Sequence, residues 1–347
     1  MNIAKLMKGI TAIFIAVIPF LTHGQDIIWE KAVPFGYSIS AELNTICQTN
    51  DGNFLAGGKS SEFGIVVPGN SGFQGTAIMK FTPEGDSLWI KKLPSLGTVK
   101  ALHPTGTGFT WAVIEAVQPF LPGNNFYFPR AILLQNDSIP LLNVSFPQLD
   151  YFEISDSYPT LDGGLIIFGS KDPSINPNLQ KDFYAFKINA LGQEVWSRAY
   201  PLGVSGFGTA GQIEPMANGR YFCSGSDGKR LVSFEIFPED GRDTLFRTWY
   251  NSPGNRVFQN PFIRQGPENA GVLSGNYSTG SGNKFYFGKH DFNSLSKIWG
   301  GEQTGGFGPL LLLFLVKPHR FTKLFEQSHG RYSGKLRQGC FQCLKFG

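Results

Sequence analysis

Groups suited to metal or redox chemistry lie near the C-terminus of this sequence. Cys340 and Cys343 form a Cys-x-x-Cys motif, and His319 and His329 precede it. Zinc sites are built from such ligands at characteristic spacings, but the spacing of these two histidines matches no usual ligand pattern. We therefore assign no metal or redox role to this motif.

Two short segments carry side-chain oxygens close together, as calcium loops do. They are residues 50–53 (Asn-Asp-Gly-Asn) and 240–243 (Asp-Gly-Arg-Asp). Neither has the bidentate Glu that ends a twelve-residue calcium loop. Asp-Gly pairs supply the positive φ angles of tight hairpin turns, so both segments are predicted to be turns.

Histidine offers the remaining candidates for acid–base chemistry. One of the five lies in the first segment and two lie near the C-terminus, which leaves His103 and His290. A Ser-His-Asp triad is defined by geometry rather than spacing, and no Gly-x-Ser-x-Gly motif supports one here. The sequence therefore predicts no catalytic residue, no cofactor-binding residue, no metal ligand and no cofactor.

A repeat of roughly fifty residues organises the chain. Stretches 75–94, 181–201 and 230–251 each hold an alternating apolar segment, a polar turn with Gly, and a second segment that opens with a large aromatic residue. Weaker copies occupy 131–147 and 284–301, and Ile27–Val33 is a copy of the last segment alone. The aromatic position recurs at Trp29, Trp89, Leu141 (where Leu replaces the aromatic), Trp196, Phe246 and Trp299.

A hairpin signal precedes each of these stretches. The signals are Asp51-Gly52, residues 106–108, Asp162-Gly163, Asn218-Gly219 and a degraded Glu268-Asn269. Each repeat thus offers four short strands, and no stretch after the first segment shows the periodicity of a helix. We predict an all-β fold: a β-propeller of four-stranded blades, about five of them recognisable, with incomplete closure. A β-sandwich and a β-solenoid are the alternatives.

The best-formed copy runs from Leu161 to Trp196 and contains LDGGLIIFGS and KDFYAFKINALGQEVW. It resembles the long repeats of secreted bacterial propeller proteins of the Bacteroidetes type, and the resemblance extends over residues 27–301. The resemblance implies a cell-surface or secreted protein and transfers no catalytic residues. The large aromatic of each last strand is expected to fill the space between adjacent blades.

Both ends of the chain depart from the repeat. Residues 1–24 combine Lys5 and Lys8, an apolar run too short to span a bilayer, and a small-residue end, which is the layout of a secretory signal peptide. An uncleaved anchor is the alternative. We expect the mature chain to begin at Gln25 and to be secreted or held at the cell surface, without stable membrane insertion after cleavage.

Residues 307–347 form an atypical basic tail beyond the propeller repeats of residues 25–306. The tail holds seven Lys or Arg and one acidic residue, Glu326. We interpret it as the product of a frameshifted or truncated reading frame, with a genuine basic tail as the alternative. Because the rest of the chain is nearly neutral, the basic pI does not indicate a nucleic-acid partner.

Cys47 and Cys223 are expected in the core.

The sequence favours an exported, non-catalytic β-propeller that binds an unknown protein or glycan. A secreted hydrolase or lyase on the same scaffold is the alternative, because function resides in sites grafted onto a fold. Two or more carboxylates, or a His with a carboxylate, that meet in one pocket of the central channel would favour the enzyme. A channel lined by backbone and apolar groups would favour binding. The expected contact loops are 60–75, 117–129 and 171–181. The sequence leaves open the ligand, the true blade number, the oligomeric state and O-glycosylation at Asp86-Ser87-Leu88 and its counterparts.

Overall fold

The computed structural model describes residues 41–65, 73–105, 108–119, 125–137, 139–171, 181–201, 208–251, 258–266, 270–279, 282–291 and 294–304. Within these ranges the chain is all β, apart from the 3₁₀ turn η1 (Pro147–Leu149). It forms several antiparallel sheets in which each strand pairs with its neighbours in sequence. The predicted fold class is confirmed at this level. No described helix is long and apolar enough to cross a membrane.

The strands of the described ranges group into five four-stranded units. The first unit contains β1 (Ala41–Gln48), β2 (Phe54–Ile65), β3 (Phe73–Phe81) and the first part of β4 (Ser87–Pro104). The second contains the rest of β4, β5 (Phe109–Pro119), β6 (Asn125–Gln135) and β7 (Ile139–Ser145). The third contains β8 (Phe152–Pro159), β9 (Leu165–Lys171), β10 (Asp182–Ile188) and β11 (Glu194–Tyr200).

The fourth unit contains β12 (Thr209–Pro215), β13 (Tyr221–Ser226), β14 (Arg230–Ile236) and β15 (Asp243–Asn251). The fifth contains β16 (Phe258–Gly266), β17 (Ala270–Thr279), β18 (Gly282–Asp291) and β19 (Lys297–Thr304). The first two units share β4, which pairs with β3 up to Leu96 and with β5 from Gly97 onward. The sequence predicts two separate strands in this stretch. The structure has the single strand β4 instead, which joins the first two units into one seven-stranded sheet.

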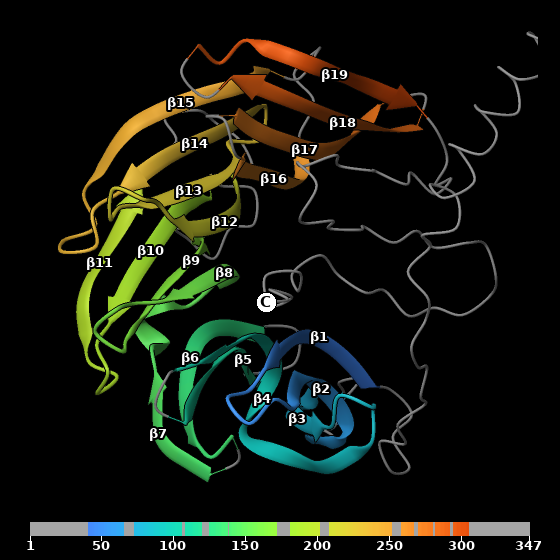
Figure 1. Cartoon of the computed structure of the whole chain (residues 1–347), viewed down its shortest axis with the longest axis vertical. Coiled ribbons are helices and arrows are strands. Elements are labelled where there is room, and N and C mark those ends of the chain that lie inside the picture. The colour runs from blue at the N-terminus through green and yellow to red at the C-terminus, as the bar shows by residue number, and fades with distance from the viewer. Residues whose placement is uncertain are drawn as a thin grey trace, which may run out of the picture.

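The units follow one another around a common centre in chain order (Figure 1). β8, β12 and β16 lie nearest that centre, and β11, β15 and β19 lie on the outside. The first strands of adjacent units contact each other, as β4 contacts β8, β8 contacts β12, and β12 contacts β16. The first strand of each unit is therefore the inner strand.

Apolar cores fill the spaces between adjacent units. One cluster joins the first and second units, another joins the second and third, and a third joins the third and fourth. A smaller cluster around Trp249 and Tyr286 joins the fourth and fifth units. Cys47 and Cys223 belong to these cores, as predicted, and both are buried.

The expected aromatic contacts are confirmed at two positions and wrong at two. Trp89 is partly buried and packs on the core between the first and second units. Trp196 is buried between the third and fourth units, and its Nε1 donates to the carbonyl of Pro238. Phe246 and Leu141 are about half exposed instead. In the fourth unit Trp249, three residues later, provides the buried ring. Trp29 and the side chain of Trp299 lie outside the described residues.

The predicted hairpin signals are confirmed in four units, where Gly52, Gly108, Gly163 and Gly219 adopt φ angles of 81–82°. Two expected contact loops are wrong in part. Residues 60–65 and 73–75 belong to β2 and β3, and residues 117–119 and 125–129 belong to β5 and β6. The third loop lies almost wholly outside the described residues, as do the signal segment, the tail and Glu268-Asn269.

Candidate functional site

Each inner strand contains a β-bulge at a similar level. Asn44 in β1, Lys100 in β4 and Ser155 in β8 are extra residues with no partner in the neighbouring strand. In β12 the pair Gly211 and Gln212 faces a single residue, and the register of β16 shifts in the same way between Gln259 and Phe262. Bulges bend a strand and redirect its side chains, and they are frequent near functional sites.

Three adjacent inner strands place ionisable and hydroxyl side chains just beyond these bulges. We name this set the axial cluster: His103 of β4, Asp156, Ser157 and Tyr158 of β8, and Glu214 of β12. Ser157 is fully buried, whereas the other four are only partly buried. The axial cluster therefore combines one buried hydroxyl group, that of Ser157, with four side chains that are partly accessible to solvent or a ligand.

A hydrogen bond joins the second unit to the third within the axial cluster. Nε2 of His103 lies 2.7 Å from Oγ of Ser157. Burial lowers the pKa of His103 to about 4, because charging an imidazole away from water is unfavourable. His103 is therefore neutral at neutral pH, with Ser157 holding its ring against β8.

Asp156 connects β8 to β12. One carboxylate oxygen accepts a hydrogen bond from the backbone N–H of Ser157, and the other accepts one from the N–H of Ile213 at 3.0 Å. Because Glu214 follows Ile213 directly, two carboxylate residues lie on adjoining inner strands. Asp156 also lies near Cys223, where burial first and then the Asp156 charge raise the pKa of the thiol.

Tyr158 lies near Glu214 on the β12 side of β8. Burial, and secondly the charge of Glu214, raise the pKa of Tyr158. The ring of Tyr158 packs edge-on against Tyr221, with 5.9 Å between centroids. Burial, then Tyr158 and Asp162, raise the pKa of Tyr221 to about 12. Both phenols therefore keep their protons at neutral pH.

Two polar atoms at bulge positions are buried and have no hydrogen-bond partner within the described residues. They are Nδ2 of Asn44 and Oε1 of Gln212. Buried polar atoms in folded proteins nearly always have a partner. One donor and one acceptor on the inner strands are thus available to a polar ligand or to water.

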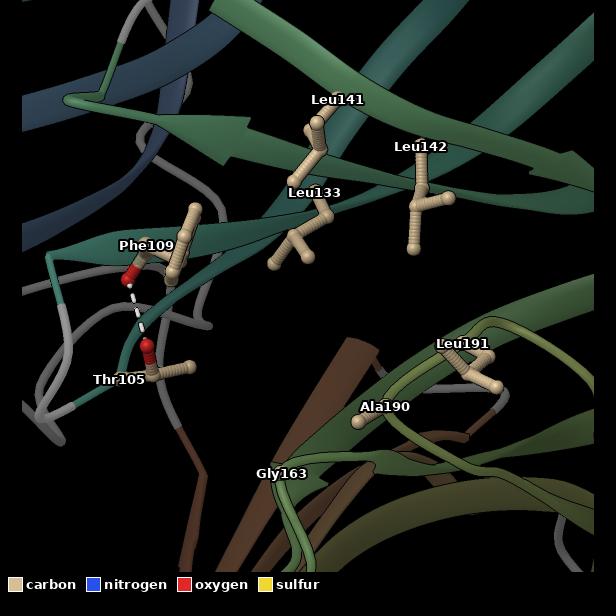
Figure 2. A pocket seen from close by; sticks show the side chains of 8 residues that line it. All are labelled: Thr105, Phe109, Leu133, Leu141, Leu142, Gly163, Ala190 and Leu191. Carbon is tan, nitrogen blue, oxygen red and sulfur yellow. Dashed lines mark hydrogen bonds between the residues drawn. The ribbon is translucent and has the colours of Figure 1, made fainter.

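A separate apolar cleft of about 360 Å³ opens between the second and third units. Figure 2 shows Phe109, Leu133 and Leu142 on one side and Ala190 and Leu191 on the other. Leu191 and Leu141 at its margin are exposed. This cleft has the character of a surface for apolar groups, and it carries no group that transfers protons.

The structure assigns structural roles to the candidates singled out in the sequence. Residues 50–53 form the β1–β2 hairpin, where Asp51 bonds Thr49, Asn53 and Lys80. Asp240 lies in the β14–β15 turn and pairs with Arg242. His290 is buried, with Nε2 bonded to the hydroxyl of Tyr286. Of these candidates, His103 is the one that contacts a neighbouring inner strand, through Ser157.

The metal and redox candidates receive no support from the described part of the chain. Cys340, Cys343, His319 and His329 lie outside it. Within it, no three His, Cys, Asp or Glu side chains lie close enough together to hold a metal ion.

No protein-family model matches this sequence, and no curated protein matches it. Among solved structures, a protein of unknown function from Bacteroides caccae is 13% identical at a TM-score of 0.40, covering 65% of this chain and 68% of its own. A polysaccharide lyase is 14% identical at a TM-score of 0.40, covering 73% of this chain and 58% of its own. An α-L-arabinanase from Penicillium chrysogenum is 14% identical at a TM-score of 0.40, covering 58% of this chain and 65% of its own. Such low scores leave function to be argued from this chain's own residues.

Proposed function

We propose that this chain is an exported β-propeller-type protein whose five described units are successive blades. The support is the sequence of four-stranded antiparallel units around a common centre, each with its first strand innermost. A sandwich would not place five inner strands side by side in chain order. Export is inferred from the layout of residues 1–24.

We further propose that the axial cluster supports a hydrolase or lyase reaction on a glycan. The observation that carries this proposal is the placement of Asp156, Tyr158 and Glu214 on two adjoining inner strands, with His103 on the next. This arrangement favours the enzyme over the non-catalytic protein that the sequence favoured. A positioned base and a positioned acid on either side of a glycosidic bond are the groups that acid–base cleavage needs.

Glu214 and Tyr158 have complementary proton chemistry. A carboxylate accepts a proton, and the phenol of Tyr158 is protonated at neutral pH, because burial and the charge of Glu214 raise its pKa. In the proposed reaction Glu214 takes a proton from water or from the sugar, and Tyr158 gives one to the leaving oxygen. Asp156 acts as a positioning residue, because both of its oxygens bind backbone N–H groups.

The test is turnover of a panel of neutral and acidic polysaccharides by the mature chain. New reducing ends report hydrolysis, and ultraviolet absorbance of unsaturated products reports elimination. Glu214→Gln and Tyr158→Phe are expected to lower the rate by about 100-fold or more. Glu153→Gln is the matched control, because Glu153 is an exposed residue of the same β8 strand. An inactive wild type, or equal losses in the control, would contradict the proposal.

Non-catalytic binding of a protein or glycan is the second candidate, and the apolar cleft favours it. Leu133, Leu142 and Leu191 give this cleft an apolar lining suited to a ligand with an apolar face. The same panel separates the two functions. Binding without any product, and unchanged by Glu214→Gln, would support the second candidate.

A further inference from the structure

The first unit has an apolar face that the other described units do not cover. Ala56, Met79 and Phe81 form its centre, and Phe54 stacks on Phe81 with 5.6 Å between ring centroids. Leu43, Ile46 and Ile90 surround them. Every member of this cluster belongs to β1–β4. We name it the first-unit face.

This face is opposite to the one that packs on the second unit. Side chains alternate between the two faces of a strand, and Cys47, Leu55 and Ile78 point into the core shared with the second unit. A single sheet cannot bury both faces by itself. The first-unit face therefore needs a cover from outside β1–β19.

The third and fourth units show how one unit covers the next. Trp196 of β11 packs on Gly241 in the β14–β15 turn, where an added Cβ would come within 2.6 Å of the ring. Trp196 donates to the carbonyl of Pro238, and Arg198 and Tyr200 donate to the carbonyls of Asp240 and Gly241. The last strand of the third unit thus binds the turn between the third and fourth strands of the fourth unit, through every second residue.

The first unit has the matching turn, and the chain has a matching strand sequence. Pro83 and Gly85 in the β3–β4 turn correspond to Pro238 and Gly241, and Gly85 has a φ of 85° against 71° for Gly241. Trp29 and Pro34 have the same spacing as Trp89 and Pro94, and as Trp196 and Pro201. By this alignment Trp29, Lys31 and Val33 take the places of Trp196, Arg198 and Tyr200.

The connection is long enough. Residues 35–40 separate Pro34 from the start of β1. Such a segment spans up to roughly 20 Å when extended, whereas packed sheets lie about 10 Å apart. The segment can therefore leave β1 and reach the face of the same unit.

We propose that Ile27–Val33 of this chain docks on the first-unit face, with Trp29 over the turn that contains Pro83 and Gly85. Glu30 points away from the face in this arrangement. The occupant is the chain's own N-terminal segment rather than a second copy, because the short connection places it beside that face at high effective concentration.

Photo-crosslinking of the mature full-length chain tests the contact directly. Trp29→benzoylphenylalanine is expected to crosslink within the same chain to the peptide that contains Phe81–Asp86, as identified by mass spectrometry. The same probe at Leu191, an exposed residue of the β10–β11 turn, is not expected to reach that peptide. Crosslinks from position 29 to any other peptide, or between two chains, overturn the proposal.

Hydrogen exchange provides the second measurement. Trp29→Ala is expected to speed exchange in β2 and β3 by roughly tenfold, because the face loses its cover. Glu30→Ala is the matched control and leaves that exchange unchanged. Equal effects of the two substitutions, or no effect of Trp29→Ala, overturn the proposal. If Trp29→Ala fails to fold, the crosslink decides.

Discussion

One position in the third strand of the first, third and fourth units carries a charged side chain that pairs with the first hairpin of its own unit. In the first and third units a Lys pairs with the hairpin Asp of its own unit: Lys80 with Asp51, and Lys187 with Asp162. In the fourth unit the charges are exchanged, because Glu235 pairs with Arg220. The position thus ties the third strand to the first hairpin whichever partner carries the positive charge.

Lys80 also joins the first unit to the second. Its Nζ lies 2.7 Å from Oδ2 of Asp51 and 2.7 Å from Oδ2 of Asp137, and Thr110 donates to the other oxygen of Asp137. Burial lowers the pKa of Lys80, but its hydrogen bonds with Asp137 and Asp51 outweigh burial, so the net pKa is raised. The ammonium group therefore stays charged.

We predict that Lys80→Met lowers the free energy of unfolding by about 3 kcal/mol, because it leaves the buried carboxylate of Asp137 unpaired. Lys59→Met is the matched control. Lys59 pairs with Glu42 at 3.3 Å near the surface, so its loss is expected to cost under about 1 kcal/mol. Urea unfolding at neutral pH measures both. Equal destabilisation by the two substitutions contradicts this account.

At the scale of the element, the sequence predicts hairpins well because their signals are local. A Gly that follows Asp or Asn fixes the turn, and alternating apolar residues then set the strands on either side. The buried ring of β15 was not predictable in this way. A register shift between Ser233 and Glu235 changes which residues face the fifth unit, and Trp249 replaces Phe246 as the buried residue.

The axial cluster illustrates the same limit. Asp156 and Tyr158 lie in one repeat and Glu214 in the next, and the three match no motif. They come together because bulges redirect two inner strands and because β8 contacts β12. Neither the bulges nor the contact leaves a signal in local sequence. The sequence therefore identifies no catalytic residue, because it carries no signal for the bulges or for this contact.

A pair of glycines tests the interlock between adjacent units. Gly241 has a φ of 71°, and its Cβ position lies 2.6 Å from the Trp196 ring; Gly219 has a φ of 81° and open space around it. Each change to Ala costs about 1 kcal/mol of backbone strain. We predict that Gly241→Ala costs a further 1–3 kcal/mol, roughly the cost of overpacking.

Thermal unfolding monitored by tryptophan fluorescence measures the difference between the two glycine variants. The emission of Trp196 should also change in Gly241→Ala and stay unchanged in Gly219→Ala. Similar losses of stability in both variants would mean that Trp196 does not pack on this turn.

At the scale of the whole molecule, the five described units form a series of interfaces, and stability depends on each one. Histidines that are neutral at neutral pH lie at two of them. His103 bonds Ser157 between the second and third units. His290 bonds Tyr286, and its ring lies 6.3 Å from that of Trp249, between the fourth and fifth. Protonation of either histidine therefore acts on the contact between units.

We predict that the molecule loses stability as the pH falls from about 6.5 to about 4. Burial lowers the pKa of both histidines, to about 4 for His103, so the unfolded chain binds more protons in this range and acid favours unfolding. His103 is expected to account for about 2 kcal/mol, after allowance for its partial exposure. Asp51 and Asp162 have lowered pKa values through their bonds to Lys80 and Lys187, although burial opposes the shift. Their contribution is lost only as the pH falls below about 4.

Urea unfolding at several pH values from 7 to 3 separates the two groups. His103→Gln retains a hydrogen-bonding side chain toward Ser157 but cannot be protonated, so its stability should fall less steeply between pH 6.5 and 4. Asp162→Asn is the control for the lower range, and should flatten the curve only below about pH 4. An unchanged slope in His103→Gln would show that His103 titrates normally and that its interface is open to water.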